Sequence, residues 1–275
     1  MNKRLAVSLL LTSILTACGG GGSSSSSTTA APDSFVGIFK GTTGDSRVLA
    51  SMVLNDGTYY YFYSGAPIST VTPASGSTPA TVTTSTDAVG GVLIGTGSGK
   101  GGSFASTNGY DYQVSTTGLS TGVSPTTLSA SYVTYASMNG TYTHNSTGTA
   151  TTFTSTYNTT LSNASPSLTA VAGIYTGTVG TTAGGTESLQ LIILPGGGVT
   201  GQSASGCFFT GTIATHATNN AYDLSITFAA TTCTYNSLTM AGMSLYDSTA
   251  STIYGAAVKT DKTGGIMFSA KKTSS

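Results

Sequence analysis

The chain has 275 residues, and nine Lys and Arg balance nine Asp and Glu, so that charged residues make up only 7% of the sequence. A net charge of zero excludes the basic surface that nucleic-acid binding requires, and we expect no nucleic-acid partner. Fifteen Tyr and nine Phe recur in alternating runs, which argues against a chain that is disordered throughout.

The N-terminal segment has the order of charge and hydrophobicity that is typical of a secretory signal. Lys3 and Arg4 precede an apolar run over residues 5–15, and small residues follow. This run is too short for a helix that crosses a bilayer core of about 30 Å. A buried core helix would not explain the polar tract at residues 19–29, and a plain cleaved signal would leave Cys18 without a role.

The end of this segment, Leu15-Thr16-Ala17-Cys18, resembles the lipobox of bacterial lipoprotein precursors, which carry a type II signal peptide. The resemblance implies that residues 1–17 are removed and that Cys18 is lipidated, with diacylglyceryl on its thiol and an acyl group such as palmitate on its new amino terminus. Several acyl chains anchor a protein effectively permanently, because each buried methylene contributes about 0.8 kcal/mol. Gly19 stands where an Asp favours inner-membrane retention, so the resemblance implies a proteobacterial outer membrane, on its periplasmic or cell-surface face.

An internal repeat follows. Residues 36–41 (VGIFKG) match residues 172–177 (AGIYTG) at an offset of 136 positions. Residues 52–57 (MVLNDG) then match residues 192–197 (IILPGG) at an offset of 140 positions. Two landmarks in the same order predict a duplicated domain.

The repeat and the composition together predict the domain organisation. Residues 18–33 are the lipidated cysteine and a Gly/Ser-rich tether, residues 34–161 the first domain, residues 162–169 a linker, and residues 170–275 the second domain. Three prolines among Ser, Thr and Ala predict a long loop over residues 64–90 of the first domain.

The local signals are β throughout, and an all-β fold class is predicted. Asp56-Gly57 between two apolar runs indicates a hairpin, and residues 221–228 alternate between apolar and polar side chains. Regularly spaced strands with polar turns predict two tandem small antiparallel β-barrels, since closure removes exposed sheet edges. Two-sheet sandwiches are the alternative. Strands are expected to begin near Phe35, Arg47, Thr58, Gly91, Gly102, Tyr110, Thr127, Met138 and Thr149, and near Gly173, Glu187, Gly198, Cys207, Ala221, Leu238, Thr252 and Gly265.

Two further cysteines, Cys207 and Cys233, are predicted to form a disulfide, because the signal places the chain in an oxidising compartment. Two free buried thiols are the alternative. No histidine stands at ligand spacing near either cysteine, so no metal site is expected.

Groups that could support catalysis are few. His144 and His216 both lie in turn-like settings and are expected to be surface-loop residues. No strand-to-helix context that could hold a Gly-x-Ser-x-Gly elbow is predicted, and no short motif with two carboxylates occurs. We therefore predict no catalytic residue, no cofactor and no enzymatic activity; a hydrolase built from scattered Ser, Asp and His is the alternative.

The run Tyr59-Tyr60-Tyr61-Phe62-Tyr63 is the candidate binding surface. On a strand, Tyr59, Tyr61 and Tyr63 share one face, while Tyr60 and Phe62 share the other. If one set packs the core, the other is exposed, and exposed tyrosines are typical of recognition surfaces. The alternative is an outer strand that the 64–90 loop covers.

Two resemblances bear on function. The order of a lipid anchor, a tether and two β domains resembles the layout of two-lobed surface lipoproteins of the transferrin-binding-protein-B type. Residues 173–177 (GIYTG) and 205–211 (SGCFFTG) are similar to Gly/Ser/Thr-rich proteobacterial lipoproteins, a group that implies no activity. We expect a non-catalytic envelope lipoprotein with a binding or structural role. A carrier of a small apolar ligand inside a barrel and a surface receptor for a host or envelope protein are the alternatives.

Overall fold

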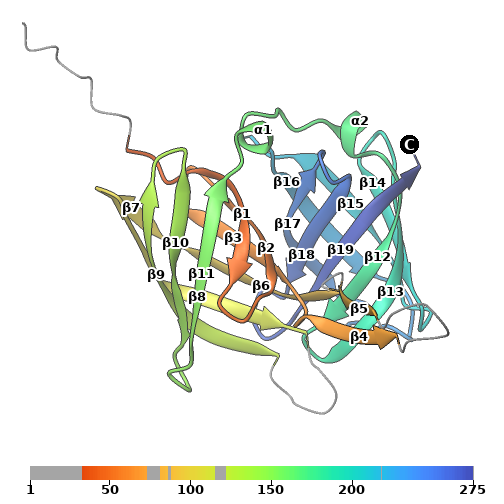
Figure 1. The fold of residues 1–275 in the computed structure, drawn as a ribbon. Coiled ribbons are helices and arrows are strands. Elements are labelled where there is room, and N and C mark those ends of the chain that lie inside the picture. The colour runs from red at the N-terminus through yellow and green to blue at the C-terminus, as the bar shows by residue number, and fades with distance from the viewer. Residues whose placement is uncertain (1–32, 73–80, 86–87, 115–121, 218, 275) are drawn as a thin grey trace, which may run out of the picture. The chain divides into compact units, whose positions relative to one another are not determined.

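The computed structural model describes residues 33–274 except 73–80, 86–87, 115–121 and 218, and side chains are not described at residues 68–72 and 81–85. The described part is all-β and contains two closed barrels, each of eight antiparallel strands (Figure 1). The predicted signal peptide, Cys18 and residues 19–32 lie outside the described residues. The two-barrel prediction is confirmed, and the sandwich alternative is wrong.

The first barrel runs from β1 to β11, and its ends close through the β1–β11 and β6–β8 pairs. Its strands are β1 (Gly37–Thr43), β2 (Val48–Val53), β3 (Thr58–Ser64), β6 (Val89–Thr96), β8 (Ser103–Gln113), β9 (Val123–Val133), β10 (Ser137–His144) and β11 (Ala150–Tyr157), with the short β7 (Ser98–Lys100) beside β8.

The second barrel is a meander in which each strand pairs with the next and β19 pairs with β12. Its strands are β12 (Gly173–Thr181), β13 (Gly184–Ile193), β14 (Gly198–Ser203), β15 (Phe208–Thr215), β16 (Tyr222–Phe228), β17 (Thr239–Asp247), β18 (Thr252–Val258) and β19 (Gly265–Ser274). Two one-turn helices, α1 (Thr159–Ser162) and α2 (Leu168–Val171), connect the barrels, and the side chains of Asn158 and Ser167 cap them. All sixteen barrel strands lie within the predicted ranges 34–161 and 170–275; that these are separate domains stays a prediction.

Two details of the first barrel differ from expectation. The 64–90 segment is not a loop throughout, because it contains a hairpin of β4 (Ile68–Thr72) and β5 (Thr81–Ser85). The strands expected near Gly102 and Tyr110 are one long strand, β8, whose pairing with β9 shifts between Ser106 and Gly109. A local irregularity of this kind looks like a strand break in the sequence.

The repeat is visible in the backbone as well as in the sequence. Gly57 and Gly197 have φ of +83° and +84° in the turns after β2 and β13. The amide of each donates to the leucine carbonyl three residues earlier, at 3.0 Å and 2.8 Å. Both glycines therefore hold the left-handed conformation that closes equivalent turns in the two barrels.

Replacing Gly197 by alanine is expected to lower the free energy of unfolding by about 1–3 kcal/mol, since the new Cβ would overlap the Ile213 carbonyl oxygen at a positive φ. The neighbouring Gly196→Ala is the matched control, because nothing lies within 4 Å of its Cβ position. Equilibrium denaturation in urea measures both. Equal effects of the two substitutions would contradict this account of the turn.

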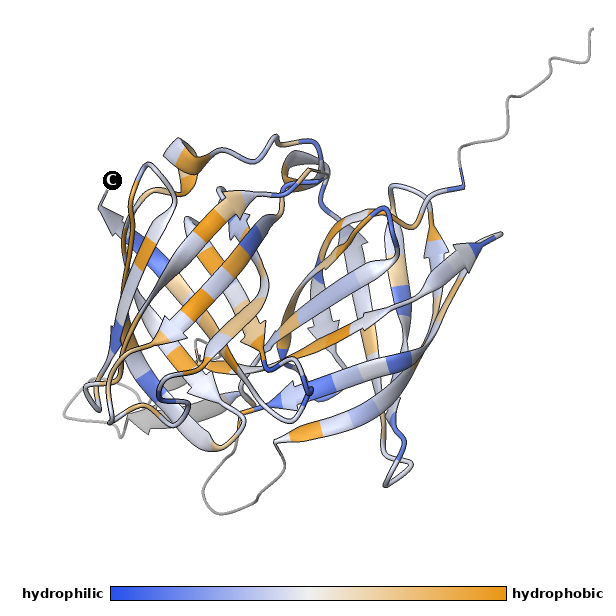
Figure 2. Ribbon diagram, turned by 180° about the vertical axis from the view of Figure 1, so that it is seen from behind, coloured by the Kyte–Doolittle hydropathy of each residue, from blue (hydrophilic) through white to orange (hydrophobic). Residues whose placement is uncertain are grey.

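Buried and more exposed residues alternate along many of the strands, and the ribbons in Figure 2 carry hydrophobic bands between paler ones. Among the described residues, the hydrophobic core inside the second barrel holds twenty-one buried residues, and that inside the first barrel holds fourteen. A third cluster of sixteen buried residues, the seam, contains side chains from both barrels: Ile38, Ala50, Met52, Leu54, Tyr60, Phe62, Val89, Val92, Tyr112, Val114, Leu161, Ala221, Met243, Leu245, Ala256 and Met267. The barrels thus share a core, and residues from Pro32 onward form one compact unit.

Candidate binding cleft between the barrels

Strand β3 is buried on both of its faces. Tyr59, Tyr61 and Tyr63 point into the first barrel and are 0–3% exposed, while Tyr60 and Phe62 lie in the seam. The expectation that one of these sets is exposed is therefore wrong, and Tyr59, Tyr61 and Tyr63 do not form a surface. The reason is tertiary, because the second barrel covers the outer face of β3.

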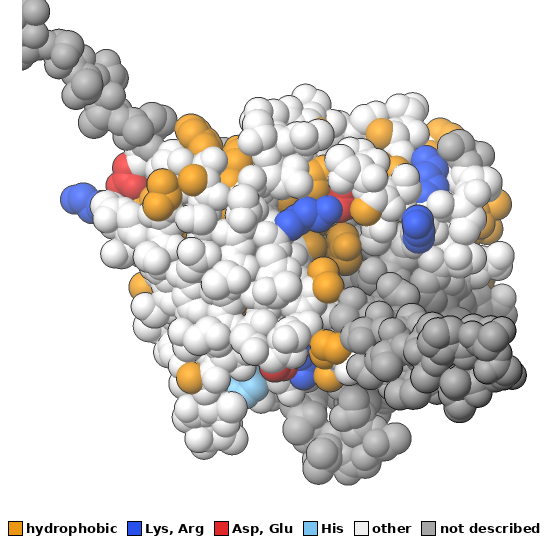
Figure 3. Space-filling model, viewed as in Figure 1, with side chains coloured by type: hydrophobic (Ala, Val, Ile, Leu, Met, Phe, Trp, Pro, Cys, Tyr) orange, Lys and Arg blue, Asp and Glu red, His pale blue; other side chains and the backbone are white. Residues whose placement is uncertain are grey.

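A cleft of about 720 Å³ opens where the seam reaches the molecular surface. In Figure 3, hydrophobic side chains gather near the middle of this face, below a neighbouring Lys or Arg and an Asp or Glu. The cleft is lined by Val48, Ala50, Phe62, Tyr63, Ser64, Ala88 and Val89 from the first barrel and by Thr176, Gly177, Thr249, Ala250, Ser251, Thr252, Tyr254, Ser269 and Lys271 from the second. Its volume is in the range of small-molecule sites.

The lining combines aromatic rings, hydroxyl groups and one cation. The rings of Phe62 and Tyr254, one from each barrel, lie 6.0 Å apart. Burial and the nearby Asp247 carboxylate raise the pKa of Tyr254 to about 12, so its hydroxyl stays protonated and can donate at neutral pH. Lys271 adds a positive charge to the lining. Such a cleft can hold a molecule with an apolar body, hydrogen-bonding groups and a negative end.

An ion pair across the seam orders one wall of the cleft. Asp247, at the end of β17, is fully buried and pairs with Lys40 of β1. Its other carboxylate oxygen accepts from the backbone amides of Thr249 and Ala250 at 3.0 Å and 3.1 Å. Burial alone would raise the pKa of Asp247, but the hydrogen bonds from Lys40, Thr249 and Ala250 outweigh it and lower that pKa.

Asp247→Asn is expected to lower the free energy of unfolding at pH 7 by about 2 kcal/mol, since it removes hydrogen bonds to a charged group. A lowered pKa in the folded state stabilises the protein above the ordinary carboxyl pKa, and that stabilisation is lost as the pH falls below it. The difference between wild type and variant should therefore shrink from pH 7 towards pH 3 in urea denaturation. A difference that stays constant with pH would contradict the lowered pKa.

A second buried carboxylate ties three strands of the first barrel together. Asp111 of β8 is 0% exposed and accepts from the Tyr63 hydroxyl of β3 at 2.6 Å and from Gln113 at 2.8 Å. Nε2 of His144, at the end of β10, lies 2.8 Å from the same carboxylate. Burial first, and the Asp111 charge second, raise the pKa of Tyr63 well above its usual range, so this tyrosine is a neutral donor.

The two histidines therefore have carboxylate partners. His144 is not a surface-loop residue, since it is only 15% exposed and packs beside Asp111, whereas His216 is more exposed and contacts Asp223 at 2.8 Å. Neither histidine bonds a serine hydroxyl in the described part of the chain.

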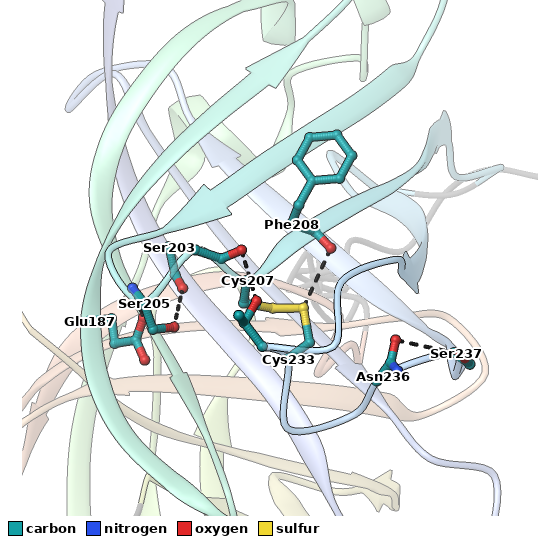
Figure 4. Close-up of a disulfide and its surroundings, with 10 residues drawn as sticks. Glu187, Ser203, Ser205, Cys207, Phe208, Cys233, Asn236 and Ser237 are labelled. Carbon is teal, nitrogen blue, oxygen red and sulfur yellow. Dashed lines mark hydrogen bonds between the residues drawn. A yellow bond between two sulfur atoms is a disulfide. The ribbon is translucent and has the colours of Figure 1, made fainter.

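The second barrel contains a disulfide between Cys207 and Cys233, whose Cα atoms lie 4.5 Å apart. It joins the residue before β15 to the loop between β16 and β17. Figure 4 shows Glu187, Ser203 and Ser205 grouped next to it. The Ser205 amide donates to Glu187 at 3.0 Å, and hydrogen bonds from Ser203 and Ser205 lower the pKa of that carboxyl group.

This end of the second barrel offers little space. The cavity beside the disulfide measures about 60 Å³, and no group of three or more His, Cys, Asp and Glu suited to a metal ion occurs among the described residues. Nor is any helix in the described ranges both long and apolar enough to cross a membrane.

Comparison with known proteins adds one observation. No protein-family model matches the chain, and no curated protein matches it. A solved structure of a predicted outer membrane protein from Bacteroides fragilis is similar at 14% sequence identity and a TM-score of 0.25, over 86% of this chain and 96% of that one.

Proposed function

We propose that this chain is a lipid-anchored envelope protein that binds a small amphiphilic ligand, without transforming it, in the cleft between its two barrels. The observation that carries the binding role is the cleft itself, a space of about 720 Å³ lined from both barrels. The anchor rests on Lys3, Arg4, the apolar run and Leu15-Thr16-Ala17-Cys18.

The packing of the barrels favours the cleft over a site inside either barrel. An eight-stranded barrel can hold a small ligand when its centre is open. Here large side chains fill both centres, among them Tyr59, Phe104 and Leu128 in the first and Tyr175, Phe209 and Phe268 in the second. A carrier with an apolar cavity inside one barrel finds no support in these interiors.

The chemistry of the lining favours an amphiphilic ligand. Phe62, Tyr254 and Val89 offer apolar contact, hydroxyls surround them, and Lys271 can pair with an anion. An envelope protein meets such molecules as lipids or as lipid-linked glycans, and the permanent anchor would keep the cleft near them.

The experiment uses 1-anilinonaphthalene-8-sulfonate, an aromatic anion, as the probe on the purified full-length protein. One molecule is expected to bind per chain with a rise in fluorescence. Ala250→Trp, on the cleft wall, should lower the affinity at least tenfold, and Lys271→Gln should lower it about threefold. Ala241→Trp is the matched control, because Ala241 is exposed and lies at a smaller cavity away from this cleft.

Equal binding by the wild type and by Ala250→Trp would contradict the cleft as the site. If the probe binds in the cleft, native mass spectrometry of protein extracted gently from the envelope should then find a bound molecule that Ala250→Trp lacks and Ala241→Trp retains.

A further inference from the structure

We propose that the end of the first barrel at which the chain enters rests on the phospholipid surface through Val133, Tyr135 and Lys100. This inference rests on the proposed lipid anchor and adds an orientation to it. We name these three residues the lipid-facing end.

The lipid-facing end exposes two large hydrophobic side chains, Val133 and Tyr135. Val133 ends β9 and Tyr135 lies in the turn that leads to β10. They are 62% and 55% exposed, the highest values among the large hydrophobic residues described. A wholly apolar valine and a tyrosine with a polar tip suit the boundary between acyl chains and headgroups.

The backbone conformation of Tyr135 indicates that its ring has a role other than stabilising the barrel. Its φ is +56°, in the left-handed region that an aromatic residue seldom occupies and that Gly or Asn adopts at less cost. The ring does not enter the barrel core; it packs edge-on against Tyr157, with 5.5 Å between the ring centres. The strained backbone therefore presents an aromatic ring at the tip of the turn.

The described part of the chain begins beside this same turn. The Ser34 amide donates to the Thr134 hydroxyl at 3.1 Å, and Asp33 bonds the Tyr132 hydroxyl and the Gly101 amide. Fourteen residues separate Cys18 from Asp33, which can span at most about 50 Å when fully extended. An anchor at Cys18 thus keeps Val133 and Tyr135 close to the bilayer at high effective concentration.

Charge at this end is compatible with an anionic leaflet. Lys100 is exposed at the tip of the β7–β8 hairpin, next to Gly101, which binds Asp33. The carboxylate of Asp33, at this same end, accepts hydrogen bonds from the Tyr132 hydroxyl and the Gly101 amide. One cation and two apolar side chains bind a membrane only weakly by themselves. The covalent anchor already holds the protein at the membrane, so a weak contact is sufficient to orient the barrel.

The absence of tryptophan from the chain allows a direct test. Tyr135→Trp places a single fluorescent reporter at the lipid-facing end, and Val133→Trp is a second reporter at the same turn. Phe208→Trp is the matched control, because Phe208 is also exposed, at 39%, but begins β15 of the second barrel beside the disulfide. Each lipidated full-length variant is reconstituted into vesicles of 70% phosphatidylethanolamine and 30% phosphatidylglycerol, with or without brominated acyl chains.

Brominated lipid should quench the tryptophan emission of the Tyr135→Trp and Val133→Trp variants by at least half, and that of the Phe208→Trp variant by less than a tenth. Lipidation of each sample is checked beforehand by mass spectrometry. Two results with lipidated protein would overturn this orientation: no quenching of either reporter at the lipid-facing end, or equal quenching of all three variants. Neither result would contradict the lipid anchor. A protein with unmodified Cys18 overturns both.

Discussion

Replacing Asp111 by alanine should lower the free energy of unfolding by about 3–5 kcal/mol, the largest loss expected from any single substitution considered for this fold. The carboxylate is fully buried and accepts from Tyr63 and Gln113 and contacts His144. Its removal leaves a cavity and a buried tyrosine hydroxyl without its acceptor, and an orphaned group of this kind costs about 1–3 kcal/mol. Urea denaturation followed by tyrosine fluorescence measures the change.

Two further variants distinguish the loss of the hydrogen bonds to Asp111 from the effect of removing any carboxylate. Tyr63→Phe removes one donor only and should lower the free energy of unfolding by about 1 kcal/mol. The double variant that combines Asp111→Ala with Tyr63→Phe should be destabilised by less than the sum of the two single effects, since the two groups interact directly. Asp223→Ala is the matched control, because that carboxylate pairs with His216 at a site where it is 57% exposed. Its effect should stay within about 0.5 kcal/mol. An Asp111→Ala variant as stable as Asp223→Ala would contradict the buried network.

The second large effect is expected at the disulfide. Substituting both Cys207 and Cys233 by serine should lower the free energy of unfolding by about 3–4 kcal/mol, because the bond closes a loop with a sequence separation of 26 residues. Guanidinium denaturation with and without dithiothreitol gives the comparison. The reductant should destabilise the wild type by a similar amount and leave the double variant unchanged. A wild type whose unfolding is insensitive to dithiothreitol would contradict a stabilising disulfide.

The second barrel was predictable because its signals are local. Alternating runs such as residues 221–228 and glycine turns such as Gly197 each specify a strand or a turn from a few neighbouring residues. All eight of its strands begin within three residues of the predicted positions. The duplicated turn at Gly57 and Gly197 made the twofold organisation visible as well, since both positions require the same left-handed backbone.

The seam and the buried carboxylates were not predictable in the same way. Asp111 and His144 are 33 residues apart and meet because β8, β9 and β10 pair in a particular register. Lys40 and Asp247 come from different barrels, so no local motif announces their pairing. The prolines near the β4–β5 hairpin concealed two strands, because proline is disfavoured within sheets.

One signal for the seam was nevertheless present. An outer barrel strand should alternate between apolar and polar residues, but residues 59–63 are aromatic at every position. A run that is apolar on both faces is typical of a strand covered on both sides. This run thus indicated that a second body packs on β3, and the cleft lies at the edge of that contact.

The most direct test of a lipid-anchored binding protein is the mass of the N-terminal peptide of the protein isolated from the cell envelope. The account predicts that this peptide begins at Cys18 and carries a thioether-linked diacylglyceryl group and an amide-linked acyl chain. A peptide that retains residues 1–17, or a mature N-terminus with a free Cys18 thiol, would contradict it.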